Sequence, residues 1–149
     1  MEKVIEKYSD MLFRLCLVML GNYSDAEDAV QETFIKYIRK SPEFETSEKE
    51  RSWLFTVAAN TCRDMLRYRK HHPADDIESI NEAAHPVSDS GILDELMTLP
   101  DKFKEVLVLY YVEDYSVKDV AKMIGKSESA VKMRLKKGRR LLKEAFNKE

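Results

Sequence analysis

The fold is decided by the stretch SVKDVAKMIGKSESAVKMRLKKGRRLLKEAF, from Ser116 to Phe146. Ser116 and Asp119 have the spacing of a capping box, which opens a short helix. Gly125 then supplies a left-handed turn residue, and Ser127 is suited to cap a second, longer helix. The stretch therefore predicts a helix-turn-helix.

The second of these helices is predicted to have one apolar face and one cationic face. At 100° per residue, its apolar or small residues fall on one side: Val131, Leu135, Gly138 and Leu142. The opposite side carries Ser129, Lys132, Met133, Lys136, Arg140 and Lys143. From residue 126 to residue 149 there are nine lysines and arginines against three glutamates, whereas a merely solvated helix usually mixes acids among its lysines. A buried stripe opposite a cationic face is typical of a helix that enters the DNA major groove. A solvated surface helix is the alternative.

The composition indicates a mostly helical protein. Four glycines and four prolines in 149 residues are few, and alternating β patterns are hard to find. No apolar run approaches the ~20 residues that span a membrane, and no signal peptide leads the chain, so we expect a cytoplasmic protein. Cys16 and Cys62 sit at helical core positions without CxxC spacing and are predicted to be reduced, buried thiols. A redox or zinc role together with His71, His72 and His85 is the less favoured alternative.

The charge of the chain is segregated, although its net value is only −2. Basic residues gather at 63–70 and in the C-terminal helix, while residues 71–99 contain seven acids and no lysine or arginine. Two cationic surfaces separated by an acidic strip suggest two DNA contacts joined by a linker. We therefore predict an all-α protein of two small domains, 1–70 and 93–149, joined by a flexible acidic linker, 71–92.

The N-terminal half has the pattern of a compact helical bundle. Apolar residues recur at three- and four-residue spacings over 4–19, and Gly21 with Asn22 is predicted to end this first helix. Ser24, with Glu27 completing a capping box, is predicted to begin a second helix. A third helix is predicted to start near residues 47–51 and to run to about Lys70.

The second helix carries an acidic side that is predicted to face away from the bundle. An isoleucine lies among acids and a glutamine there, in the set Asp25, Asp28, Gln31, Glu32 and Ile35. A solvated acidic surface is one interpretation. The exposed isoleucine favours the other, a protein-docking face.

The third helix presents an aromatic ring, polar groups and guanidinium groups on one side. These residues are Trp53, Thr56, Asn60, Arg63 and Arg67. The combination suits single-stranded DNA, whose bases stack on rings while arginines follow the phosphates. Two alternatives stay open: Trp53 as a core residue, and the arginines as partners of Asp64 in surface ion pairs.

With these motifs together, the chain resembles an extracytoplasmic-function (ECF) sigma factor of the sigma-70 type. The resemblance rests on DAEDAVQETF (25–34), WLFTVAANTCRDMLRYRK (53–70) and LPDKFKEVLVLYYVEDYSVKDVAKMIGKSESAVKMRLKKGRRLL (99–142), and it covers nearly the whole chain in order. The chain departs from the family pattern at residues 129–131, where Ser-Ala-Val replaces Gly-Thr-Val. It departs again at Met133, where serine is common, and at Gly138, where alanine is usual. No promoter consensus is therefore transferred.

The resemblance implies three binding surfaces. The first, formed by Asp25, Asp28, Gln31, Glu32 and Ile35, would dock on the β′ clamp helices of core RNA polymerase, whose β flap is a further expected contact. The second, with the loop at 41–49, would hold the melting −10 element through Trp53, Thr56, Asn60, Arg63, Arg67, Arg69 and Lys70. The third would read the −35 element: Lys132, Met133 and Lys136 at base edges, with Ser127 and Ser129 nearby, and Lys126, Arg134, Lys137 and Arg140 at phosphates.

The resemblance also implies a cognate anti-sigma factor, often membrane-bound, that holds the protein at the inner face of the membrane. No small-molecule substrate, cofactor, metal or catalytic residue is expected, because the chain has no Walker loop, glycine-rich dinucleotide turn or HExxH motif. Its end at Glu149 predicts no fused regulatory domain. Two other classes are weighed against this one: an autonomous helix-turn-helix regulator with an N-terminal helical interaction domain, and an antagonist that mimics these faces.

Overall fold

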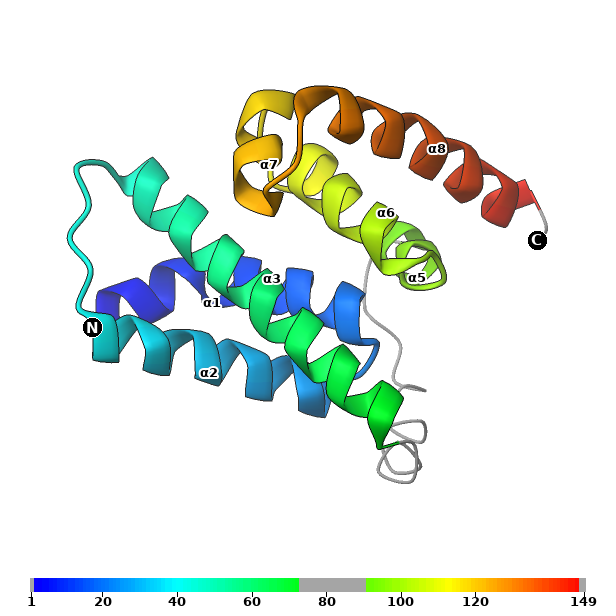
Figure 1. The fold of residues 1–149 in the computed structure, drawn as a ribbon. Coiled ribbons are helices and arrows are strands. Elements are labelled where there is room, and N and C mark those ends of the chain that lie inside the picture. Colours follow the sequence, from blue (N-terminus) through cyan, green and yellow to red (C-terminus); the bar gives the residue numbers. More distant parts are fainter. Residues whose placement is uncertain (1, 73–90, 148–149) are drawn as a thin grey trace. The chain divides into compact units, whose positions relative to one another are not determined.

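The structure is a computed structural model that describes residues 2–72 and 91–147, except for the side chains of 91–93. All regular elements in this part of the chain are helices, and they form two compact units that divide between Pro86 and Val87 (Figure 1). The predicted all-α, two-domain fold is confirmed. The predicted flexible linker at 71–92 lies outside the described residues apart from its two ends, and so does His85.

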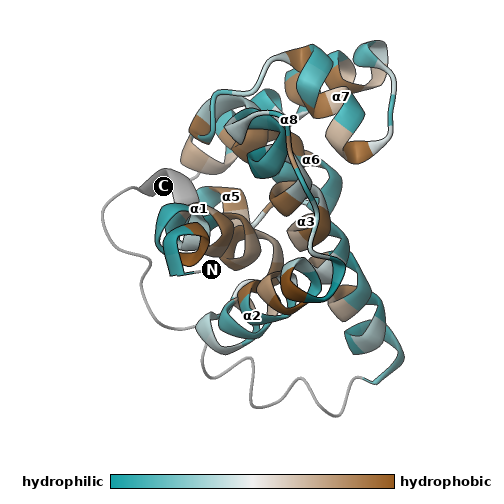
Figure 2. Ribbon diagram, turned by 90° about the vertical axis from the view of Figure 1, so that its left-hand side faces the viewer, coloured by the Kyte–Doolittle hydropathy of each residue, from teal (hydrophilic) through white to brown (hydrophobic). Residues whose placement is uncertain are grey.

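The first unit consists of α1 (Glu2–Leu20), α2 (Tyr23–Lys40) and α3 (Ser47–His71), each of which packs against the other two (Figure 1). Figure 2 shows hydrophobic and hydrophilic residues alternating along α2, as expected for a helix with one buried face. The largest fully buried side chains are Tyr8, Leu12, Leu15, Val18, Met19, Leu54 and Phe55. Cys16 and Cys62 are free and buried, as predicted.

The start of α2 differs from the prediction. Asn22 is only 2% exposed, and its side-chain oxygen accepts a hydrogen bond from the backbone N–H of Asp25 at 2.8 Å. The predicted capping box of Ser24 and Glu27 is therefore wrong, because Ser24 already lies inside the helix. The amide of Asn22 also donates to the Asp25 carboxylate at 3.1 Å, so the capping residue makes two hydrogen bonds to Asp25.

The second unit consists of α5 (Gly91–Met97), α6 (Asp101–Leu107), a π-helical turn η2 (Val108–Val112), α7 (Val117–Ile124) and α8 (Glu128–Asn147). Its core is formed largely by α6 and η2, whose Val106, Val108 and Leu109 are buried. No helix in the described part of either unit is long and apolar enough to cross a membrane.

The predicted helix-turn-helix is present with the expected caps. Ser116 Oγ accepts a hydrogen bond from the N–H of Asp119 at 3.1 Å, and Ser127 Oγ accepts one from the N–H of Ala130, also at 3.1 Å. Between them Gly125 has φ +69°, the left-handed conformation that favours glycine. Caps at both helices fix where α8 begins and therefore which residues share its outer face.

Candidate nucleic-acid and protein interfaces

The surface of α8 is divided between a buried stripe and a cationic face. Val131, Leu135 and Gly138 are buried, and a Cβ at Gly138 would lie 3.0 Å from Leu107 Cδ1 of α6. Most of the residues predicted for the −35 element are exposed: Lys126, Ser127, Ser129, Lys132, Met133, Lys136, Lys137 and Arg140. Arg134 is half-buried. We call the set Ser129, Lys132, Met133, Lys136 and Arg140 the cationic face.

Two contacts engage residues at the edge of this helix surface. Arg140 Nε lies 4.0 Å from Glu144 Oε1, with both side chains more than half exposed. Lys137 Nζ lies 5.6 Å from the centre of the Phe103 ring. A solvent-exposed ion pair is worth only ~0–1 kcal/mol, so a phosphate can replace Glu144 as the partner of Arg140 at little cost.

The predicted −10 face of α3 is brought together along one side of the helix. Asn60, Arg67 and Lys70 are exposed, whereas Trp53, Thr56 and Arg63 are half-buried. Arg63 Nη1 donates to Asn60 Oδ1 at 2.5 Å, and Arg67 forms an exposed ion pair with Asp64. The two interpretations of Arg67, as a surface ion-pair partner and as a strand contact, are thus compatible.

Trp53 belongs to an aromatic cluster that supports the loop before α3. Its ring centre lies 5.8 Å from that of Tyr37 in α2 and 5.9 Å from that of Phe44 in the loop. Tyr37 and Phe44 are themselves 6.4 Å apart. The loop leaves α2 through Ser41, whose φ of +42° turns the chain out of the helix. The half-buried indole therefore braces this loop.

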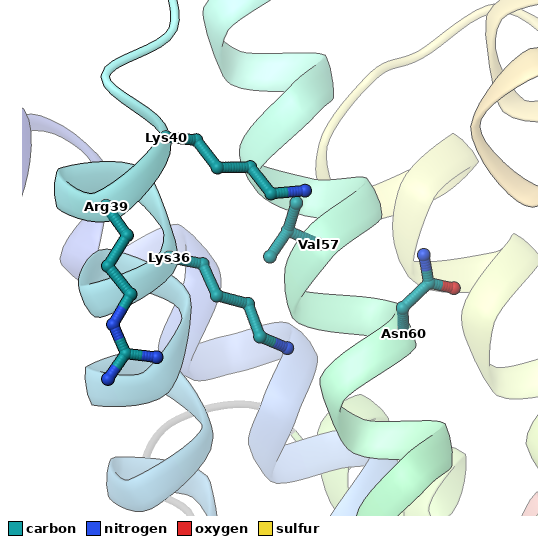
Figure 3. Close-up of a pocket in the computed structure, with 5 residues that line it drawn as sticks. All are labelled: Lys36, Arg39, Lys40, Val57 and Asn60. Atoms are coloured by element: carbon teal, nitrogen blue, oxygen red, sulfur yellow. The ribbon is translucent and has the colours of Figure 1, made fainter.

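A basic pocket lies beside this face, and sequence reasoning missed it. It has a volume of about 330 Å³ and is lined by Lys36, Arg39, Lys40, Val57 and Asn60. Figure 3 shows the side chains of Lys36 and Lys40 extending from α2 toward α3, and Lys36 Nζ donates to Thr61 Oγ1 at 3.0 Å. The signal in the sequence was three cations within five residues, at 36, 39 and 40. The same pattern is also expected at a helix C-terminus, where cations interact favourably with the helix dipole.

Asp25 and Arg69 were predicted for different surfaces, but they contact each other. They form an ion pair with side chains 21% and 22% exposed, and Arg69 Nη1 also donates to the carbonyl of Leu20 at 2.9 Å. This pair joins the start of α2 to the end of α3.

The remaining predicted docking residues lie along one side of α2. Asp28, Gln31 and Ile35 are exposed and Glu32 is half-buried. Ile38, at 56% exposed, continues this stripe and was missed. Its position three residues after Ile35 was the available signal. An aliphatic stripe between acids offers a partner both apolar area and charge.

The second unit has an apolar groove of about 680 Å³. It is lined by Leu96, Leu107, Tyr111, Val112, Arg139, Leu142, Lys143 and Phe146. Tyr111 is 50% exposed, and its hydroxyl accepts a hydrogen bond from Arg139 Nη1 at 2.9 Å. The lining is mostly apolar and includes the cations Arg139 and Lys143.

Both units match models of known domains. Residues 4–72 match the model "Sigma-70 region 2", and residues 91–142 match the model "Sigma-70, region 4". Together the two define a bacterial transcription initiation factor built from these two regions.

Several named relatives are similar in sequence to this chain over most of its length. The chain is 30% identical to the ECF RNA polymerase sigma factor SigM of Bacillus subtilis, over 99% of this chain and 95% of the relative. It is 29% identical to the ECF RNA polymerase sigma factor SigW of the same organism, over 95% and 86%, and 34% identical to the RNA polymerase sigma factor CarQ of Myxococcus xanthus, over 85% and 77%. The chain belongs to the ECF family of RNA polymerase sigma factors.

Solved structures have the same fold. The sigma factor RpoE from Bartonella quintana, solved with the anti-sigma factor NepR, is similar with a TM-score of 0.78 and 24% identity, covering 99% of this chain and 98% of RpoE. CnrH, solved with the cytosolic domain of CnrY, has a TM-score of 0.71 at 24% identity, covering 99% and 88%.

Proposed function

We propose that the chain carries out the sigma-factor function through separate surfaces on its two units, with 1–70 and 93–149 as the functional domains. In the second unit, the cationic face of α8 enters the major groove of the −35 element. Lys132, Met133 and Lys136 face base edges, and the flanking cations Lys126, Arg134, Lys137 and Arg140 hold phosphates. The observation that carries this proposal is the division of α8 into a buried stripe and an exposed cationic face.

In the first unit, we propose that the −10 non-template strand follows α3 and the braced loop. Arg63 and Arg67 lie along the strand, and the basic pocket of α2 and α3 takes phosphates beside Asn60. If an unstacked base binds in this loop, the contacts that it gains there would offset the few kcal/mol that unstacking costs. Trp53 supports the loop, and Arg69 supports the end of α3 through Asp25.

The two protein-facing surfaces have different chemistry. The exposed stripe of α2, with Asp28, Gln31, Ile35 and Ile38, suits the β′ clamp helices of core RNA polymerase, because it combines acids with aliphatic area. The apolar groove of the second unit suits a helix with an apolar face, and the β flap is the partner proposed for it.

We further propose a cytoplasmic protein that is held by an anti-sigma factor, at the inner face of the membrane where that factor is membrane-bound. One similar fold, RpoE, was solved with the anti-sigma factor NepR, and another, CnrH, was solved with the cytosolic domain of CnrY. The chain itself contributes binding and promoter choice, and the chemistry of RNA synthesis stays with the polymerase, so no cofactor is required.

The test is a pull-down of bacterial core RNA polymerase with this chain, followed by run-off transcription from a library of random promoters. Capture of polymerase with selective transcripts supports the proposal and gives the promoter sequence. Tight binding of the chain alone to duplex DNA, without capture of polymerase, would favour the autonomous regulator.

A further inference from the structure

Met133 is the exposed apolar residue at the centre of the cationic face. Its side chain is 73% exposed, more than any other large hydrophobic side chain in the described residues. The other two large hydrophobics exposed in the second unit, Tyr111 and Phe146, line the apolar groove instead. Met133 therefore stands apart from both the core and the groove.

The neighbours of Met133 on the helix surface leave it open to a ligand. Residues three and four positions away are neighbours on a helix, and these are Ser129 and Ala130 on one side and Lys136 and Lys137 on the other. The preceding residues are too short to cover the thioether. Both following lysines are exposed, and the ammonium group of Lys137 lies 5.6 Å from the centre of the Phe103 ring rather than over Met133. An apolar group thus lies between cations that are suited to phosphates and guanine acceptors.

Major-groove chemistry offers one distinctive apolar group to such a side chain. Thymine presents a C5-methyl group, whereas cytosine and the purines present only polar groups and ring hydrogens at the corresponding edge. Methionine carries no hydrogen-bond donor and only a weak acceptor, so it gains little from a polar base edge. Its flexible thioether adapts closely to an apolar surface.

We propose that Met133 is a specificity-determining residue that selects a thymine in the −35 element by contact with its C5-methyl group. This rests on the proposed function of α8 in the major groove. Ser129 and Ala130 leave space for the methyl group, and Lys132 and Lys136 anchor the flanking positions. Burial of one methyl-sized group corresponds to about fourfold in affinity.

The experiment uses the chain in complex with core RNA polymerase on a promoter selected from the random library. Each thymine of the −35 element, on either strand, is replaced singly by 2′-deoxyuridine, which removes only the methyl group. Initiation is measured with the wild-type chain, with Met133→Ala and with Met133→Gln. All three residues form helices well, and the position is exposed, so both variants are expected to fold.

The expected result is one thymine whose replacement lowers initiation by the wild-type chain about fourfold and leaves both variants unaffected. Equal sensitivity of all three proteins to every replacement, or no sensitivity in any, would overturn the role of Met133. A scrambled −35 element separates the two proposals. If scrambling leaves initiation unchanged, the proposed function of α8 fails. If it abolishes initiation while no thymine is methyl-sensitive, only the role of Met133 fails.

Discussion

Arg69, in the last turn of α3, forms an ion pair with Asp25, in the first turn of α2. The same guanidinium group donates to the carbonyl of Leu20 at the end of α1, and the same carboxylate accepts from the capping Asn22. One partly buried pair therefore ties the ends of all three helices of the first unit.

We expect Arg69→Ala to lower the free energy of unfolding by about 1–3 kcal/mol. The substitution removes a charged hydrogen bond to Leu20 and leaves the shielded Asp25 carboxylate without its cation. Arg67→Ala is the matched control, because its pair with Asp64 is more than half exposed and is worth only ~0–1 kcal/mol. Urea unfolding followed by circular dichroism measures both. Equal effects would show that the Asp25 pair has no special role in stability.

Close packing between α6 and α8 is expected to require a small residue at position 138. A Cβ there would already lie 3.0 Å from Leu107 Cδ1 and 3.5 Å from Phe103 Cβ. Gly138→Val should therefore destabilise the second unit by about 1–3 kcal/mol. Gly138→Ala should be close to neutral, because better helix propensity, about 1 kcal/mol, offsets the tighter contact. Thermal unfolding of the three proteins tests this, and a valine variant as stable as the wild type would contradict it.

The polymerase and −35 surfaces should be separable by mutation. We expect Gln31→Ala combined with Glu32→Lys to weaken binding to core RNA polymerase, because the change removes an exposed amide and reverses a charge on the α2 stripe. Lys132→Ala combined with Lys136→Ala should reduce use of the −35 element and leave polymerase affinity unchanged. Affinity capture and run-off transcription measure the two effects. Unchanged polymerase affinity in the first variant would remove the assignment of the α2 stripe.

The basic pocket should contribute to salt-dependent binding of single-stranded DNA. Arg39→Ala combined with Lys40→Ala is expected to lower the slope of log affinity against log salt by about 0.7 for each phosphate that the pocket no longer neutralises. The measurement is binding of a −10 non-template oligonucleotide to the complex with core polymerase over a range of salt concentrations. Lys3→Ala combined with Lys7→Ala removes the same charge from α1 and should leave the slope unchanged. If both pairs change the slope equally, general charge rather than the pocket explains the effect.

Tyr8 should make the stability of the first unit fall at alkaline pH. Burial, reinforced by the hydrogen bond and the charge of Glu50, raises the pKa of Tyr8 from 10.0 to about 12. Since the unfolded chain loses this proton first, the free energy of unfolding decreases as pH rises from about 10 to about 12. Tyr8→Phe should be less stable than the wild type at pH 8, and this difference should shrink above pH 10. A difference independent of pH would contradict the prediction.

The helix-turn-helix could be predicted because its signals are local. A cap, a left-handed glycine and an amphipathic period act within a few residues, and Ser116, Gly125 and Ser127 are found in those roles. The predicted start of α2 was wrong because Asn22 and Ser24 are both good capping residues. In the structure Asn22 is the cap, and the Asp25 carboxylate beside it accepts one hydrogen bond from Asn22 and pairs with the distant Arg69, a contact that local sequence does not reveal.

The basic pocket, the apolar groove and the aromatic brace could not be predicted because each joins residues that are distant in sequence. Lys40 and Asn60 are brought together only by the packing of α2 on α3, and Leu96 meets Phe146 only through the fold of the second unit. Sequence periodicity identifies which face of a helix is exposed, but it does not identify the element that lies opposite.

Trp53 is the single tryptophan of the chain, and it touches both the last turns of α2 and the loop that precedes α3. Intrinsic indole emission therefore originates from this one site. Under the proposed function, a rearrangement of Phe44 on binding of the −10 strand would change the emission of this chain without any attached dye. The chain thus carries its own optical probe of the loop proposed to hold that strand.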